Sequence, residues 1–143
     1  MIISNRILEQ AKELGACRLA DVKDADVPEL ARLFFTPQGR EFCLVHDFPT
    51  MADFRQFKAH HCGDNGIHVD CGAYSSRNEE KCGLVGKTSA ELEYDGVRGL
   101  VVLMHGAQAT IKLRNYAVVT VEKKGDDSTV EIINEDNTGI VLW

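Results

Sequence analysis

The sequence lacks the long apolar segments that place a chain in or across a membrane. It contains no apolar run of about 18 residues, so no transmembrane helix is expected. Ser4, Asn5 and Arg6 interrupt its apolar start, so the N-terminus has no apolar core of an export signal. The chain has five cysteines, an odd number that cannot all pair internally. We therefore expect a cytoplasmic protein with free thiols.

The sequence also lacks the short motifs that identify common enzyme classes. It contains no P-loop, no GxGxxG, no GxSxG and no HExxH, and no His-x-His pair of the cupin type. Its net charge is −6, which argues against a broad surface for nucleic acid or for anionic membranes. We expect no catalytic residue and no cofactor. The sequence leaves open whether the protein is an enzyme, and a protein without enzymatic activity is the favoured interpretation.

The composition is that of an ordinary globular protein. The chain has 143 residues, of which 44% are hydrophobic and 27% charged. A chain of this length buries enough surface to fold without a disulfide or a metal. We expect one domain, or two small subdomains that share one core.

The first part of the chain, residues 1–65, predicts a helical capping subdomain. Apolar residues recur there at helical spacing, and Gly15 is a plausible stop after the first helix. Asp26, Thr36 and Thr50 each precede an apolar helical pattern and are good N-cap residues. The Phe48-Pro49 pair should end the third helix.

The second part, residues 66–143, predicts short strands separated by Gly, Asn and Asp. In one series Ala90–Tyr94 aligns with Ala109–Leu113 and then with Ser128–Ile132, and the same step backwards from Ala90 reaches Cys71. A second, interleaved series aligns Gly83 with Leu100 and continues to the C-terminal segment. A period of about 17–22 residues with short strands is typical of a β-solenoid.

The predicted fold class is therefore α+β: an N-terminal helical cap followed by a short right-handed parallel β-helix of about three to four coils. The left-handed form would show an aliphatic residue at every sixth position, and this sequence does not. A small antiparallel jelly roll or barrel is the competing fold, because the same strand number allows it.

The densest group of metal-ligating residue types is His60, His61 and Cys62, followed by His68. Their spacing matches no structural zinc template, so a metal site is one hypothesis among others. His60 and His61 also suit the C-terminal end of a helix. His68 should point outward from its strand, whereas Cys71 falls on an inward repeat position and is expected in the core.

Two other patterns have plain structural interpretations. Cys43 and His46 lie close together on an expected helix, but apolar neighbours predict a buried structural cysteine rather than a nucleophile. Glu91, Lys112 and Glu131 are expected at equivalent positions of successive coils, as a ladder of alternating charge. The acidic residues of this part could alternatively form a carbohydrate-binding or metal-binding face, as on longer β-helix enzymes: Glu91, Glu93, Glu122, Asp126, Asp127, Glu131, Glu135 and Asp136.

The C-terminal segment ends in apolar residues with no polar cap after them. An uncovered last coil leaves an exposed strand edge, which favours pairing with another chain. We therefore expect a homo-oligomer interface at Val141, Leu142 and Trp143.

Several strings of the sequence carry a resemblance to a family: Thr36–Leu44, His46–Pro49, Leu103–Ala107 and Tyr116–Val119. On these residues the chain resembles a group of small bacterial proteins of gut anaerobes, which pair a helical N-terminus with a short β-helix-like tail. The resemblance implies no activity and no catalytic residues. The predicted coils are also similar in kind to those of the bactofilins, which are polymerising β-solenoids; this likeness concerns the fold alone.

Taken together, these patterns predict a non-enzymatic protein-interaction or scaffold module with a protein partner or self-association. Nucleic acid and membrane partners are not expected. The alternative is a small carbohydrate-binding or metal-binding protein or enzyme, which would use the His/Cys cluster or the acidic face.

Overall fold

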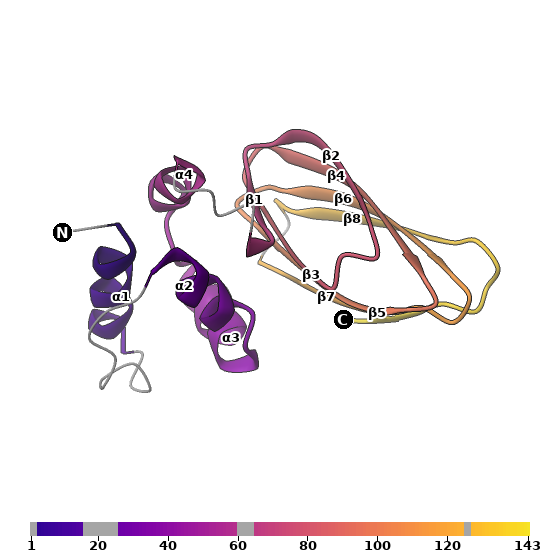
Figure 1. Ribbon diagram of the computed structural model, residues 1–143, viewed down its shortest axis with the longest axis horizontal. Coiled ribbons are helices and arrows are strands. Elements are labelled where there is room, and N and C mark those ends of the chain that lie inside the picture. Colours follow the sequence, from indigo (N-terminus) through magenta and orange to yellow (C-terminus); the bar gives the residue numbers. More distant parts are fainter. Residues whose placement is uncertain (1–2, 16–25, 60–64, 125–126) are drawn as a thin grey trace. The chain divides into compact units, whose positions relative to one another are not determined.

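The computed structural model describes residues 3–15, 26–59, 65–124 and 127–143 (Figure 1). The chain divides into two compact units, Met1–Ile67 and His68–Trp143. The first holds the helices and the second holds almost all of the strands, so the structure is of the α+β class. None of the described helices is long and apolar enough to cross a membrane.

The helical unit contains four described helices, and the last three begin directly after the predicted cap residues Asp26, Thr36 and Thr50. They are α1 (Ile3–Glu13), α2 (Val27–Phe34), α3 (Pro37–His46) and α4 (Met51–Ala59). The side chain of Asp26 accepts a hydrogen bond from the N–H of Glu29, and that of Thr36 accepts one from Gly39. Each bond satisfies one of the free N–H groups at a helix start, so these two predicted caps are confirmed.

Phenylalanines dominate the buried side chains of the helical unit. The rings of Phe34 and Phe54 lie 6.4 Å apart in an edge-to-face arrangement, and Phe34 meets Phe35 in the same way at 5.1 Å. Ile7 and Leu8 supply the buried side of α1. This unit therefore has an apolar core, as expected from the sequence.

The second unit is a β-solenoid of about four turns built from two parallel sheets. Its strands are β1 (Ile67–Val69), β2 (Gly72–Arg77), β3 (Lys81–Val85), β4 (Thr88–Asp95), β5 (Arg98–Met104), β6 (Gln108–Arg114), β7 (Val118–Lys123), β8 (Thr129–Asn134) and β9 (Ile140–Leu142). One sheet has the order β1-β3-β5-β7-β9 and the other β2-β4-β6-β8. Because the strands pair in parallel, the competing jelly roll and antiparallel barrel are excluded. The predicted hand stays a prediction.

The strand register confirms the repeat but corrects several of the predicted alignments. Ala90 pairs with Ala109, as expected. Leu100, however, pairs with Lys81 instead of Gly83. Ala90 also pairs with Tyr74 rather than with Cys71, so the step into β4 is shorter than expected. The coils thus differ in length, because the turns between strands absorb different numbers of residues.

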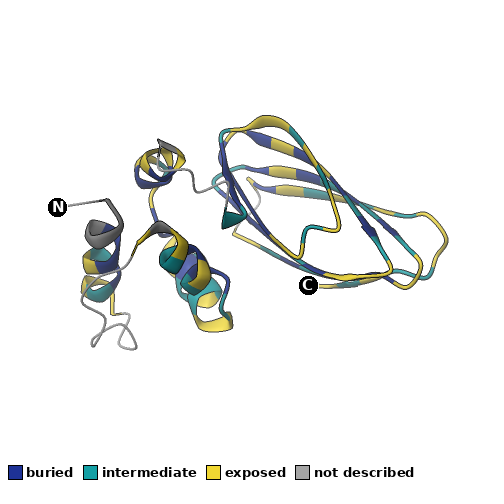
Figure 2. Cartoon of the chain, viewed as in Figure 1, coloured by how far each residue is buried: buried dark blue, intermediate teal, exposed yellow. Residues whose placement is uncertain are grey.

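Side chains of both sheets fill the solenoid interior, and buried and exposed residues alternate along the strands (Figure 2). Leu92, Ile111 and Leu113 pack with Leu103 and Val119 in this core. Most of strand β5 is buried on both faces, as its apolar sequence predicts. The interior of the middle coils is therefore apolar.

Candidate functional site

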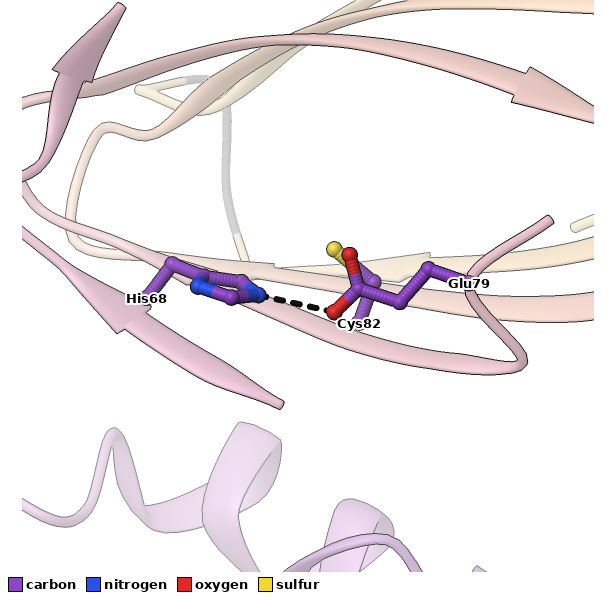
Figure 3. Close-up of side chains that lie close together, drawn as sticks. All are labelled: His68, Glu79 and Cys82. Carbon is purple, nitrogen blue, oxygen red and sulfur yellow. Dashed lines mark hydrogen bonds and ion pairs between the residues drawn. The ribbon is translucent and has the colours of Figure 1, made fainter. Parts of the chain in front are cut away.

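The first coil departs from this apolar pattern because polar side chains enter it. His68 lies on β1, Tyr74 on β2 and Cys82 on β3, and Glu79 lies in the turn between β2 and β3. We call these four residues the first-coil cluster. Figure 3 shows the His68 ring pointing at the Glu79 carboxylate, with the Cys82 sulfur beside it. Three strands and one turn thus bring the cluster together.

The Glu79 carboxylate is the hub of this cluster. Its Oε2 lies 2.7 Å from Nε2 of His68, and its Oε1 accepts a hydrogen bond of 2.7 Å from the Tyr74 hydroxyl. The Tyr94 hydroxyl donates to the backbone oxygen of Glu79 at 2.8 Å. The His68 ring also stacks on Tyr74, with centroids 4.0 Å apart. The contacts with His68 and Tyr74 satisfy both oxygens of a carboxylate that would be costly to bury without partners.

Burial and hydrogen bonding set the ionisation of the cluster. Burial alone would raise the pKa of Glu79, but hydrogen bonds from His68 and Tyr74 outweigh it and hold that pKa below its ordinary value. Burial, together with the nearby Glu79, raises the pKa of the Cys82 thiol. At neutral pH the cluster therefore holds a carboxylate beside a protonated thiol, which is a poor nucleophile.

The donor atoms of this cluster also suit a metal ion. A ring nitrogen of His68, a carboxylate oxygen of Glu79 and the sulfur of Cys82 all lie within 4.8 Å of one another. His68 and Cys82 are buried. Nitrogen, oxygen and sulfur in one small volume form a donor set found at zinc sites.

His68 is the one member of the predicted metal group that the structure describes, and it lies in this cluster. His60, His61 and Cys62 fall outside the described residues, so the predicted group itself stays a prediction. His68 was expected to point outward, which is wrong, because it is only 8% exposed. Strict alternation fails on this short strand, where Ile67 and Val69 are buried as well.

The cysteine predictions have mixed outcomes. Cys43 is buried, as expected, and burial raises its pKa to about 12, which leaves it protonated near an exposed His46. Cys71 was expected in the core and is exposed instead. The first coil is shorter than the expected repeat, so Ala90 pairs with Tyr74, and Cys71 falls in the turn before β2.

The outer face of the β2-β4-β6-β8 sheet carries a different ladder from the one expected. Glu91 pairs with Thr110, and Thr110 pairs with Glu131, whereas Lys112 pairs with Glu93. The predicted Glu91–Lys112–Glu131 ladder is therefore wrong: it skips Thr110, the partner of Glu91 on β6, and the longer step from β6 to β8 brings Ile133 rather than Glu131 beside Lys112. This face instead carries an open groove of about 520 Å³, whose lining includes Ser75, Glu91, Gln108, Thr110, Thr129 and Glu131.

The last coil exposes apolar side chains. Strands β8 and β9 end the two sheets, so among the described strands each has a neighbour on one side only. We define the last-coil surface as Ile140, Val141, Leu142 and Trp143. Trp143 is 72% exposed and Leu142 51%. The three predicted interface residues thus lie together at one open end of the solenoid.

Comparisons of the chain with protein-family models, with curated proteins and with solved structures gave no match. The β-solenoid arrangement is shown by the strand pairing alone. The resemblance to small bacterial proteins and to bactofilins gains no support from these comparisons. The argument for function therefore depends on the residues themselves.

Proposed function

We propose that this protein is a protein-interaction module that self-associates through its last-coil surface. The observation that carries the proposal is the incomplete cover of the last coil. Ile111 on β6 and Val119 on β7 are fully buried, whereas their strand partners in the last coil, Ile132 and Val141, are only partly buried. A further coil, or a partner in its place, would complete the core.

The strand edges support the same surface. An end strand of a sheet presents unpaired N–H and C=O groups, which can pair with a strand of another chain. Here two such edges, β8 and β9, lie at the same end of the solenoid. Apolar side chains accompany them: of the eight large hydrophobic residues that are exposed in the described chain, Ile140, Leu142 and Trp143 lie on β9 or directly after it. Edges and apolar area therefore coincide.

The proposed occupant is a second copy of this chain. A two-fold axis through the open end would place the same residues opposite each other, so one apolar surface covers the other. Such a closed dimer would bury the β8 and β9 edges of both copies.

Sedimentation velocity over a range of concentrations tests this proposal. The wild-type chain should form a dimer, and a Leu142→Lys/Trp143→Ser variant should raise the dimer dissociation constant at least tenfold, because a charge and a lost indole spoil the apolar surface. Val45→Lys is the matched control, because Val45 is an exposed apolar residue of the helical unit. It should dimerise like wild type.

Two results would overturn the proposal. One is a wild-type chain that stays monomeric at high concentration, which would leave the surface to a different protein. The other is a dimer that persists unchanged in the Leu142→Lys/Trp143→Ser variant. Deletion of residues 140–143 provides an independent variant, which should also raise the dimer dissociation constant at least tenfold.

A second candidate function, carbohydrate binding, is favoured by the groove on the β2-β4-β6-β8 sheet. Glu91 and Glu131 flank Thr110 there, two strand spacings apart, and the lining also includes the hydroxyl and amide groups of Ser75, Ser89, Gln108 and Thr129. Such groups pair well with sugar hydroxyls. A glycan array tests this function. Binding that falls at least tenfold in the Glu91→Gln/Glu131→Gln variant, but not in the control Glu80→Gln, would support carbohydrate binding. If the wild-type protein binds no glycan on the array, this candidate function is ruled out.

A further inference from the structure

We propose that the first-coil cluster binds a divalent transition metal ion of the zinc type, with His68, Glu79 and Cys82 as ligands. This site is separate from the last-coil surface and does not depend on self-association. It shares one ligand, His68, with the predicted group of His60, His61, Cys62 and His68, whereas Glu79 and Cys82 were not predicted as ligands.

The donor set selects the metal class. Zinc in proteins binds imidazole nitrogen, thiolate sulfur and carboxylate oxygen, whereas calcium and magnesium prefer sites made of oxygen alone. Cys82 supplies the sulfur, and a thiolate favours soft or borderline ions such as Zn²⁺ and Co²⁺. Three protein ligands leave a fourth tetrahedral position, which a water molecule can occupy.

The geometry needs only a small adjustment. Ligand atoms around a tetrahedral zinc ion lie about 3.3–3.8 Å apart, as follows from bonds of about 2.0–2.3 Å. The three ligand atoms here lie within 4.8 Å of one another. Nε2 of His68 and Oε2 of Glu79, at 2.7 Å, must separate slightly while the sulfur moves closer. Glu79 lies in a turn rather than in a strand, so its side chain can shift without breaking a strand pair.

The surroundings already orient two of the ligands. Tyr74 donates to the second carboxylate oxygen of Glu79 and stacks on the His68 ring. Partners of this kind hold ligands in place at metal sites, and their loss weakens binding about 10- to 100-fold.

Ser76 adds a polar group beside the same carboxylate. It lies two residues after Tyr74 and therefore on the same face of β2. Its Oγ atom is buried and has no hydrogen-bond partner of good geometry among the described residues. This hydroxyl therefore offers a partner for a metal-bound water.

Titration of metal-free protein with Zn²⁺ or Co²⁺ tests the site directly. Isothermal calorimetry should show one high-affinity ion per chain. Co²⁺ should give the charge-transfer absorption of a cobalt–thiolate bond, which reports sulfur ligation. Bound metal should also raise the melting temperature in proportion to the logarithm of its free concentration.

The variants separate this site from other thiols and histidines. Cys82→Val keeps the apolar volume of the core and should abolish the cobalt–thiolate band, while His68→Gln and Tyr74→Phe should each weaken binding at least tenfold. Cys71→Ser is the matched control, because Cys71 is an exposed thiol of the same coil. Circular dichroism of each metal-free variant checks that it folds.

Each outcome decides the proposal. Loss of the thiolate band in a folded Cys82→Val protein, with an unchanged Cys71→Ser protein, supports it. Absence of binding to the wild-type chain overturns it, and so does binding that survives in Cys82→Val. A thiolate band that disappears only in a His60→Ala/His61→Ala/Cys62→Ala variant would assign the metal to that segment and overturn the first-coil site.

Discussion

Gly99 shows how one residue makes room for the polar end of the solenoid. A Cβ atom at this position would overlap the ring atom Cε1 of Tyr94, and it would also come within 2.9 Å of Cδ1 and Cζ. Tyr94 is buried, and its hydroxyl donates to the backbone oxygen of Glu79. The absence of a side chain at Gly99 therefore places Tyr94, which in turn supports the turn that carries Glu79.

We expect Gly99→Ala to destabilise the solenoid by about 1–3 kcal/mol, because an added methyl group in a packed core forces neighbouring side chains to move. Urea unfolding measures this loss. Ser89→Ala, an exchange on the exposed face of β4, serves as the control and should leave the unfolding midpoint nearly unchanged. Equal midpoints for the two variants would contradict the assigned role of Gly99.

Asp95 joins three coils on the outer face and gives the protein an acid-sensitive contact. Its carboxylate accepts a hydrogen bond of 2.6 Å from Asn115 and pairs with Arg77 and Arg114, each at 3.1 Å. The bond from Asn115, assisted by Arg114, lowers the pKa of Asp95 below its ordinary value. The ionised form is thus favoured in the folded state.

This lowered pKa predicts the direction of a pH effect. The stabilisation by Asp95 is complete above the pKa of an unfolded aspartate, about 3.9, and is lost as the pH falls through the lower pKa of the folded state. Asp95→Asn should therefore reduce stability near neutrality and flatten the acid side of the profile of unfolding free energy against pH. Glu80→Gln is the control. Parallel profiles for Asp95→Asn and wild type would rule out this role.

Local chemistry explains which single residues could be predicted from sequence. Asp26 and Thr36 act on a backbone N–H within the first turn of their own helix, so their capping follows from short patterns. His68 and Glu79 are 11 residues apart in the sequence. They meet only because the turn between β2 and β3 carries Glu79 back toward β1. No spacing in the sequence marks that contact, and for this reason Glu79 and Cys82 were missed.

At the scale of the elements, the apolar side chains that pack inside the solenoid stabilise the stacked coils. Ile111 on β6 is fully buried, whereas Ile133 on β8 is 37% exposed. Both are isoleucines of the same sheet, so they form a matched pair that differs in burial.

Ile111→Ala should cost about 2–5 kcal/mol, because it removes a branched side chain and leaves a cavity. Ile133→Ala should cost about 0.5 kcal/mol or less, as expected of a surface exchange. Chemical unfolding followed by far-ultraviolet circular dichroism compares the two variants. Similar costs for both would contradict the inward and outward assignment of these strands.

The repeat period was a better guide to the fold than to the register. Alternation identified most inward positions, because a register error of two positions leaves the face of a strand unchanged. The unequal turns could not be predicted: the coil that begins at Gly72 is shorter than the next one, and the step from Ala109 to Val130 is longer. A constant step placed Cys71 beside Ala90 and Glu131 beside Lys112, and the unequal turns make both placements wrong.

At the scale of the whole molecule, the two ends of the solenoid differ in chemistry. The first coil contains a hydrogen-bonded polar cluster, and the last coil exposes apolar side chains and two strand edges. The middle coils have a closed apolar core. The two proposals therefore concern opposite ends of the strand order and can be tested independently.

Trp143 provides the most direct test of the last-coil interface, because it is the only tryptophan of the chain and is 72% exposed. Its fluorescence should be shifted to the blue and shielded from acrylamide at high protein concentration. On dilution the emission should shift to the red, in step with dissociation of the dimer seen by sedimentation. Emission typical of a fully hydrated indole at every concentration would contradict self-association through the last coil.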